Sequence, residues 1–400
     1  MKIKKIYWHF PHLKFWMGGT KFLFNVIKEI SKYKNLKISL ITNKSNDIFI
    51  NKFKKECNID IHIINKFACT NDLYYWLFFP FFLFYEILII VFTLNKYDYM
   101  IGMAFFPSNL LTYFISKLHK KEYFIYCYEP FPFFHNKKYI NSQPFFYKLI
   151  FKTLSFFYGW LDVWAVKQAK KVFTLNQITK KFTDEIYGVD SIVTYMGVDT
   201  NFFRKIEKNN YFKEKYKDRI IISHSTDYTP YKGTHLAIEV IRKLLKKYPK
   251  IILLITSTQP NSPNKKNIED LIKRYKLENN VKLLGLLEEK LIPHLYSASL
   301  VYLSCSYDDF MGTTSSNLPV KEALACETPA IRSKITMEDV EDGVSGFLVD
   351  PKNINEVVDK IEFLIKNPEK AKQMGKEGRK KIVKLYNWKK VSQIIVKNLN

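Results

Sequence analysis

Short apolar runs alternate with longer amphipathic stretches along the whole chain. In the first half the runs occupy residues 3–7, 37–42, 59–64, 97–101, 123–127, 171–174 and 192–194. In the second half they occupy residues 220–223, 251–256, 281–284, 300–304, 329–332 and 347–349. Short apolar runs separated by helical stretches are typical of buried parallel strands joined by crossover helices. The pattern therefore predicts an α/β protein built from doubly wound, Rossmann-like parallel sheets.

The alternation is interrupted near residues 195–205 (YMGVDTNFFRK), where a glycine and turn-forming Asp and Asn residues break the pattern. A chain of 400 residues is long enough for two domains with separate cores. We expect an N-terminal domain over residues 1–196, a C-terminal domain over residues 197–385, and a helix over residues 386–400 that packs back on the N-terminal domain. Ligands of doubly wound sheets bind outside the carboxyl ends of the strands, so we expect the functional site in a cleft between the domains.

Residues 73–94 (LYYWLFFPFFLFYEILIIVFTL) are almost entirely apolar and aromatic, and their number would suffice to span a bilayer. Pro80 and Glu86 interrupt the segment, however, and strands are predicted on both sides of it. A spanning segment would therefore divide a domain. We favour a helix that is buried on the sheet and exposes an aromatic face suited to a membrane interface, with a true span as the alternative.

The chain carries 63 Lys and Arg against 38 Asp and Glu, which gives a net charge of +25. A surplus of this size favours anionic partners such as phosphates, anionic lipids or nucleic acid. The abundance of Lys, Asn, Ile, Phe and Tyr fits a genome-wide compositional bias equally well. The basic residues are spread along the whole chain and no recognition motif accompanies them, so we do not expect nucleic acid as a partner.

Five cysteines are present and none forms a C-x-x-C pair: Cys57, Cys69, Cys127, Cys305 and Cys326. An odd number without paired spacing argues against a disulfide framework or a zinc site and fits a reducing compartment. The start, MKIKKIYWHF, lacks the small-residue cleavage site of a signal peptide and is expected to form the first strand. We expect a cytoplasmic protein that could contact the anionic inner face of the membrane.

Motifs in the second half carry a family resemblance. They are YMGVDTNFF at 195–203, YKGTHLAIEVI at 231–241, VKLLGLLEEKLIPHLYSASLVYLSCS at 281–306, NLPVKEALACETPAI at 317–331 and the segment from DGVSGFLVDP at 342 to WKKV at 391. Together they resemble the retaining glycosyltransferases of the GT-B fold, family four. The likeness covers most of the second half. In the first half it is limited to Gly18-Gly19 and to YCYEP at 126–130.

The resemblance implies two Rossmann-like domains, of which the N-terminal one faces the acceptor and the C-terminal one binds the donor. It implies a metal-independent glycosyltransferase of the hexosyltransferase type. The donor would be a nucleotide-diphosphate sugar, with no further cofactor, and the acceptor a glycan or a lipid-linked molecule.

The motifs also indicate which residues bind the donor. The free backbone N–H groups and the dipole at the start of the helix after Leu318-Pro319 suit a diphosphate. Glu322 lies about one turn into this helix, and the family's matching Glu accepts the ribose hydroxyls. Glycines after the first strand let the backbone approach the donor. The expected donor-binding residues are Gly18, Gly19, Thr314, Ser315, Ser316, Asn317, Leu318 and Glu322.

Lys232 is the first expected catalytic residue, because its ammonium, in a glycine-bearing turn, can stabilise the departing phosphates. Tyr128 and Glu129 occupy the first-domain motif near the transferred sugar and are the other two. The pair Asp308-Asp309 does not predict a metal site, because GT-B enzymes do not rely on a metal-binding Asp motif. His135 and His224 show no characteristic spacing, and we expect them to be structural.

Three positions depart from the family pattern. Thr314 replaces the first of two Glu residues separated by seven residues, with Asp308 or Asp309 as possible substitutes. Asp227 stands where the family often has an Arg for the diphosphate, so we expect a different loop arrangement or a larger role for Lys232. Tyr128 stands where the family has a His.

These departures keep a second hypothesis open: a catalytically silent relative that binds a nucleotide sugar or glycan, or acts as a partner subunit. A nucleotide-sugar epimerase of the same fold is a third. The closing segment and the Leu-Pro-x-x-Glu helix favour a transferase over an epimerase. We therefore expect a retaining glycosyltransferase.

Overall fold

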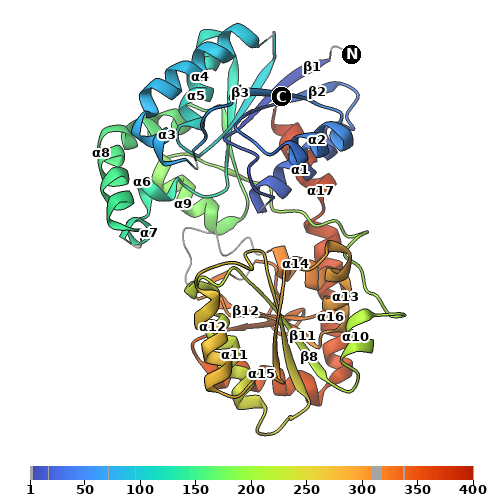
Figure 1. The fold of residues 1–400 in the computed structure, drawn as a ribbon. Helices are drawn as coiled ribbons and strands as arrows, with labels where there is room; N and C mark the ends of the chain where they lie inside the picture. Colours follow the sequence, from blue (N-terminus) through green and yellow to red (C-terminus); the bar gives the residue numbers. More distant parts are fainter. Residues whose placement is uncertain are drawn as a thin grey trace. The chain divides into compact units, whose positions relative to one another are not determined.

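The computed structural model describes residues 3–16, 18–70, 72–94, 96–141, 143–307, 318–336 and 338–399, which form two compact units (Figure 1). Among these residues, the N-terminal unit contains 3–196 and 388–399, and the C-terminal unit contains 197–307 and 318–387. Each unit has its own parallel sheet and its own core, and each is described by itself below.

The N-terminal unit is built on a seven-stranded sheet with the order β3-β2-β1-β4-β5-β6-β7. Its strands are β1 Lys4–Phe10, β2 Leu36–Asn43, β3 Asp60–Asn65, β4 Tyr99–Met103, β5 Glu122–Cys127, β6 Lys171–Thr174 and β7 Ile192–Val193. All neighbouring strands are parallel. The order reverses between β1 and β4, so the sheet is doubly wound, as the alternating pattern predicted.

Helices cover both faces of this sheet (Figure 1). They are α1 Gly18–Ile30, α2 Asp47–Cys57, α3 Leu73–Leu77, α4 Phe79–Thr93, α5 Ser108–Leu118, α6 Pro132–His135, α7 Lys137–Asn141, α8 Phe145–Lys167, α9 Gln177–Tyr187 and α17 Trp388–Asn398. Helices α1, α2 and α17 lie on one face, and α4, α5 and α8 lie on the other.

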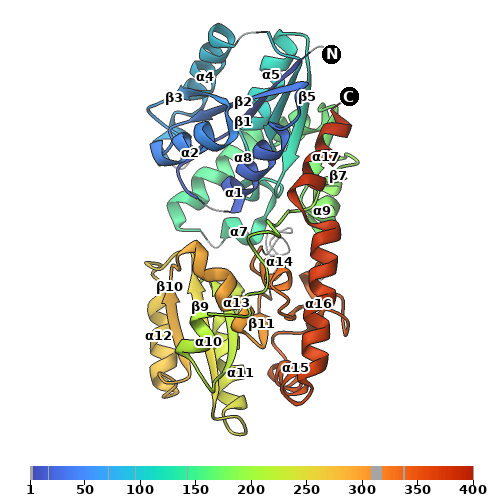
Figure 2. The same ribbon diagram turned by 90° about the vertical axis from the view of Figure 1, so that its right-hand side faces the viewer.

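Helix α17, the last of the chain, packs beside α1 in the N-terminal unit (Figure 2). The ring of Trp388 lies 5.6 Å from that of Phe22 on α1, measured between centroids, and Val391 is buried. The W-x-x-V motif thus supplies two apolar contacts of this helix.

The apolar segment 73–94 forms two helices, α3 and α4, instead of one continuous span. Only Phe79, Glu86 and Ile90 of the fifteen α4 residues are buried. The carboxylate of Glu86 accepts hydrogen bonds from Asn43, Asn65 and Tyr75, which tie the helix to the ends of β2 and β3 and to α3. The segment therefore packs on the sheet through one side, as predicted, and leaves aromatic side chains exposed on the other.

The C-terminal unit has a six-stranded parallel sheet with the order β10-β9-β8-β11-β12-β13. Its strands are β8 Ile220–Thr226, β9 Ile251–Ser257, β10 Val281–Gly285, β11 Val301–Ser304, β12 Ala330–Ser333 and β13 Gly346–Val349. The order again reverses, here between β8 and β11. The predicted α/β architecture with two doubly wound sheets is confirmed.

The helices of the C-terminal unit also form two layers (Figure 1). They are α10 Tyr211–Lys215, η1 Pro230–Lys232, α11 Thr234–Leu244, α12 Lys265–Arg274, η2 Glu289–Leu291, α13 Ile292–Ala298, α14 Leu318–Ala325, η3 Lys334–Thr336, α15 Ile354–Lys366 and α16 Pro368–Leu385. Helices α11, α12 and α15 lie on one face of the sheet, and α10, α13, α14 and α16 lie on the other.

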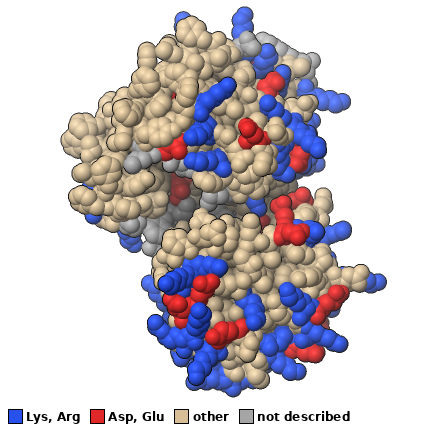
Figure 3. Space-filling view, in the orientation of Figure 1, with Lys and Arg blue, Asp and Glu red and all other residues tan. Residues whose placement is uncertain are grey.

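Charge is distributed unevenly over the surface shown in Figure 3. Lys and Arg are scattered over the C-terminal unit, interspersed with Asp and Glu. The part of the N-terminal unit at the left of this view, which includes α8 in Figure 1, is almost free of charged side chains. The positive surplus is therefore not uniform over the N-terminal unit.

Candidate functional site

Two turns meet at the switch point of the C-terminal sheet, where the strand order reverses. The turn at residues 230–233 follows β8, and the segment at residues 305–307 follows the neighbouring strand β11. The backbone N–H of Tyr307 donates a hydrogen bond of 3.1 Å to the carbonyl of Tyr231. Ligands of doubly wound sheets bind at this kind of position, so the geometry marks a candidate site.

Gly233 allows these two turns to approach each other. Its φ is +68°, in the left-handed region, and a Cβ here would lie 2.0 Å from the carbonyl oxygen of Cys305. A side chain would therefore be both strained and in collision with backbone. The glycine of the Lys-Gly motif is required by this close contact.

Lys232 is the last residue of η1 and is half-buried. Burial lowers the pKa of its ammonium; the negative charge of Asp227 opposes this shift and the positive charge of Arg332 adds to it. Asp227 itself is part of the turn, because its carboxylate accepts hydrogen bonds from the backbone N–H and the hydroxyl of Thr229. Asp227 therefore stabilises the turn that precedes Lys232.

Glu322 lies on α14, one turn from its start, as predicted. Its Oε2 accepts a hydrogen bond of 3.2 Å from the hydroxyl of Tyr296 on α13. Glu322 is half-buried, whereas Tyr296 is buried. The carboxylate is thus held by a neighbouring helix, and Leu318 begins the same helix.

A buried group of three charges lies behind these turns. Asp339 is fully buried and forms ion pairs with Lys321, at 2.9 Å, and with Arg332 at the end of β12. Burial opposes the ionisation of Asp339, but the charges of Arg332 and Lys321 and their hydrogen bonds hold its pKa below the ordinary value. The group carries a net charge of one positive unit close to Lys232. Sequence reasoning missed it, although Lys321 directly precedes Glu322.

Several predicted residues lie outside the described part of the chain. These are the donor-binding candidates Thr314, Ser315, Ser316 and Asn317, together with Asp308 and Asp309.

The N-terminal unit brings three of its four predicted site residues together. Gly18 and Gly19 begin α1, and Tyr128 follows β5. The Tyr128 hydroxyl donates a hydrogen bond of 3.0 Å to the carbonyl of Gly19. A Cβ on Gly19 would lie 2.9 Å from the ring atom Cε2 of Tyr128, whereas one on Gly18 would meet no atom within 4 Å. Glu129, the fourth, follows Tyr128 and is half-buried.

The two histidines considered from sequence have defined partners. His224 is buried; its Nδ1–H donates to the carbonyl of Leu303 at 2.8 Å, and its Nε2 lies 3.0 Å from the hydroxyl of Thr234. Burial lowers its pKa to about 4. Both nitrogens serve to connect β8, β11 and α11. Nε2 of His135 lies 2.7 Å from the buried carboxylate of Asp162 on α8.

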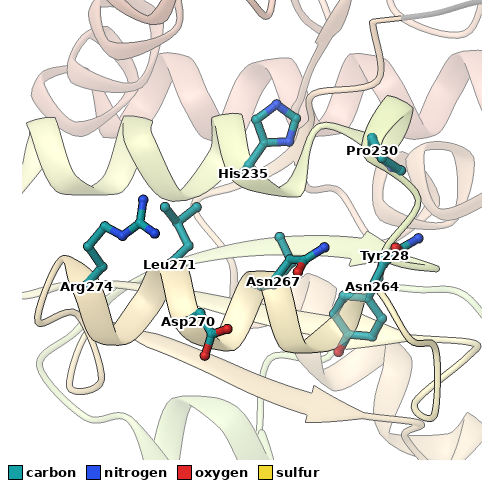
Figure 4. A pocket seen from close by; sticks show the side chains of 9 residues that line it. Tyr228, Pro230, His235, Asn264, Asn267, Asp270, Leu271 and Arg274 are labelled. Carbon is teal, nitrogen blue, oxygen red and sulfur yellow. The ribbon is translucent and has the colours of Figure 1, made fainter.

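A separate open cavity of about 320 Å³ lies between the start of α11 and α12 (Figure 4). Its wall includes Tyr228 and Pro230 from the loop after β8, His235 of α11, and Asp270 and Arg274 of α12. Neither Lys232 nor Glu322 lines it. The loop after β8 contributes to both the cavity and the candidate site, but the two are distinct.

The sequence of this chain is similar to one family model and to several known proteins. Residues 205–381 match the family model described as glycosyl transferases group 1. The MMP alpha-(1->4)-mannosyltransferase of Mycolicibacterium hassiacum is 28% identical over 243 residues, which cover 59% of this chain and 55% of that protein. The chain thus spans about half the length of the first curated relatives that it matches.

Solved structures match the whole chain. The structure of Anabaena HepE in complex with UDP and glucose is similar with a TM-score of 0.76 and 17% identity, and the match covers 99% of both chains. S. aureus TarM in complex with Fondaparinux, alpha-GlcNAc-glycerol and UDP is similar with a TM-score of 0.70 and 14% identity over the full length of both chains.

These matches define the class of protein. The chain has the two-domain α/β architecture of the GT-B glycosyltransferases. Residues 205–381, within the C-terminal unit, match the family model of the glycosyl transferases group 1. The resemblance to group 1 glycosyltransferases of the GT-B fold that the motifs indicated is thereby confirmed.

Proposed function

We propose that the protein is a retaining glycosyltransferase that moves a sugar from a nucleotide-diphosphate sugar to a glycan or lipid-linked acceptor. The observation that carries this proposal is the arrangement at the switch point of the C-terminal sheet. There the turn with Lys232 adjoins the segment after β11, and both lie in the part of the chain that matches the glycosyl transferases group 1 model, as does the helix with Glu322.

The diphosphate of the donor would bind beside Lys232. The first backbone N–H groups of α11 follow this residue directly, and the N-cap residue, Gly233, has no side chain that could cap them. A helix start of this kind favours an anion. The positive group of Lys321, Asp339 and Arg332 adds to the favourable potential. Glu322 would then accept the two ribose hydroxyls, since a carboxylate has two oxygens with about four acceptor sites.

In the transfer step, Lys232 would stabilise the negative charge that develops on the departing nucleotide diphosphate. Such stabilisation is often the largest single contribution to catalysis. The acceptor hydroxyl would attack from the face that the diphosphate leaves, which retains the anomeric configuration. We propose that cations of the chain serve in place of a metal ion and that the donor is the only nucleotide required.

The relatives support a nucleotide-sugar donor. HepE was crystallised with UDP and glucose, TarM with UDP and sugar-containing ligands, and the mycobacterial relative is named a mannosyltransferase. By analogy, a hexose or N-acetylhexosamine carried by a nucleoside diphosphate is the substrate class to test here.

The test is a hydrolysis screen with purified full-length protein and a panel of UDP- and GDP-activated hexoses and N-acetylhexosamines. We expect slow release of nucleoside diphosphate from one donor, faster release with a suitable acceptor, and at least tenfold slower release in both cases for Lys232→Ala. Tight binding of a donor without turnover, for every acceptor tried, would instead support the silent relative.

A further inference from the structure

The outer faces of α4 and α8 each carry a row of exposed apolar side chains. On α4, Phe81, Phe84, Leu88 and Phe92 follow helical spacing and are all exposed. On α8, Phe145, Leu149, Phe156 and Trp160 do the same. Phe92, Phe145 and Phe156 are 83%, 81% and 80% exposed. Helices of a water-soluble domain normally place polar residues on this side.

Both helices pack against α5, and aromatic contacts link the inner side of α8 to α3 and α4. The ring of Phe79 on α4 lies 5.1 Å from that of Tyr158 on α8, and the ring of Trp76 on α3 lies 5.2 Å from that of Phe151. Figure 3 shows few charged side chains on this part of the N-terminal unit. We call the exposed residues of α4 and α8 the aromatic surface.

The charged side chains of α3, α4, α5 and α8 that are not buried are all positive. The two acidic residues of these helices, Glu86 and Asp162, are both buried. Lys148 is half-buried and Lys152 is exposed, close to the apolar stripe of α8, and no carboxylate of the described residues forms an ion pair with either. An apolar surface with unpaired lysines and without exposed acids is complementary to a bilayer that contains anionic lipids. A second copy of the chain would instead bring lysine against lysine.

Helix α8 would lie on such a bilayer and not cross it. By length and composition, α8 is the one helix among the described residues that could cross a membrane. Its inner side, however, is built into the N-terminal unit: Asp162 binds Asn109, His135 and Tyr187, and Ala165 and Val166 are buried. Removal of α8 from the unit would leave these groups without partners, at a large energetic cost.

We infer that the aromatic surface, together with Lys148 and Lys152, docks the N-terminal unit on the interface of an anionic membrane. The exposed Phe and Trp side chains enter the boundary between headgroups and acyl chains, and the two ammonium groups meet lipid phosphates. This inference goes beyond the proposed function, and its test uses neither donor nor acceptor, so the two can fail separately.

The test is flotation of the full-length protein with vesicles of phosphatidylcholine alone or of equal parts phosphatidylcholine and phosphatidylglycerol. We expect binding to both, with stronger binding to the anionic vesicles. The fourfold variant Phe81→Ser/Phe84→Ser/Phe156→Ser/Trp160→Ser should bind at least about tenfold more weakly, because most of the inserted apolar area is lost. Ile48→Ser/Val383→Ser, which removes exposed apolar side chains elsewhere, should bind like the wild type.

Two further measurements do not depend on the fold of the fourfold variant. Lys148→Gln/Lys152→Gln should lose most of the preference for anionic vesicles while still binding. In the wild type, lipids brominated near the headgroup end of the acyl chain should quench Trp160, and Trp160→Phe should remove that part of the quenching. Absence of vesicle binding by the wild type overturns the inference, and so does a lipid-free dimer that the fourfold variant abolishes.

Discussion

The hydroxyl of Tyr296 donates a hydrogen bond of 3.2 Å to Oε2 of Glu322. Burial and the negative charge of Glu322 raise the pKa of Tyr296 well above its ordinary value, so the tyrosine keeps its proton and remains a donor. The interaction joins α13 to α14 and fixes the orientation of the carboxylate. A fixed carboxylate is a better acceptor for two neighbouring hydroxyls than a mobile one.

Glu322→Gln should weaken the binding of a nucleoside diphosphate about tenfold, because an amide N–H2 replaces one acceptor oxygen. Calorimetry with UDP and GDP measures the effect. Tyr296→Phe keeps the carboxylate and removes its support, so we expect a smaller loss, about threefold. Unchanged affinity in Glu322→Gln would reject the assignment of this residue to the ribose.

Lys232→Ala should lower kcat/KM for transfer at least tenfold, since loss of one charge at the leaving group costs on the order of 3 kcal/mol of activation free energy. The matched control is Lys246→Ala, which removes an exposed lysine from the same unit. Equal kcat/KM in wild type and Lys232→Ala would show that the diphosphate leaves without help from this ammonium.

The depressed pKa of Lys232 predicts a pH dependence. Only the protonated amine attracts the diphosphate, and burial and Arg332 make its proton easier to lose than that of an ordinary lysine. Affinity for a nucleoside diphosphate should therefore fall with rising pH at values below the ordinary lysine pKa of 10.5. Calorimetry between about pH 7 and 10 measures this. Lys232→Arg should bind with little change over the same range, because a guanidinium stays charged. A parallel decline in both proteins would assign the titration to another group.

Gly18 and Gly19 are neighbours with different surroundings, and this allows a matched pair of variants. Gly19→Ala forces the ring of Tyr128 to move, because the new Cβ would lie 2.9 Å from it. We expect a destabilisation of roughly 1–3 kcal/mol, measured by thermal unfolding. Gly18→Ala meets nothing within 4 Å and should leave the melting temperature unchanged.

If the donor approaches Gly18 as predicted, Gly18→Ala should nevertheless raise KM for the donor. Normal kinetics in Gly18→Ala would remove this glycine from the candidate site. A melting temperature of Gly19→Ala equal to that of the wild type would contradict the tight packing against Tyr128.

The strands could be predicted because parallel strands buried on both faces are continuously apolar. Runs such as residues 251–256 correspond closely to β9, Ile251–Ser257, and the positions of Lys232 and Glu322 follow from motifs that lie next to such strands. The hydrophobic pattern and short motifs were therefore sufficient to predict the strands and the places of these two residues along the chain.

Contacts between side chains distant in sequence could not be predicted in this way. The hydrogen bond from Tyr128 to Gly19 joins residues 109 positions apart. The group of Lys321, Arg332 and Asp339 depends on how α14 and β12 pack against the loop after β12. The sequence pattern indicated residues 73–94 as an interfacial segment, but it did not indicate α8. The Lys and Asp residues of α8 resemble those of an ordinary amphipathic helix, and only the structure shows that Asp162 is buried.

Glu86 on α4 predicts how stability depends on pH. Burial raises its pKa from 4.5 to about 7, against hydrogen bonds from Asn65, Tyr75 and Asn43 that lower it. Below pH 4.5 the group is protonated in both states. Between that pH and about 7 the unfolded chain releases the proton and the folded protein retains it, so stability falls as pH rises, by up to about 3 kcal/mol.

Glu86→Gln removes this titration and keeps an acceptor oxygen for the two asparagines. As pH rises from about 5 to 8, the melting temperature of the variant should therefore fall less than that of the wild type. Scanning calorimetry measures both. Glu278→Gln, at an exposed position, should follow the wild-type profile. Identical profiles for wild type and Glu86→Gln would mean that Glu86 is ionised in the folded protein throughout this range, because only a group that titrates differently in the two states couples pH to unfolding.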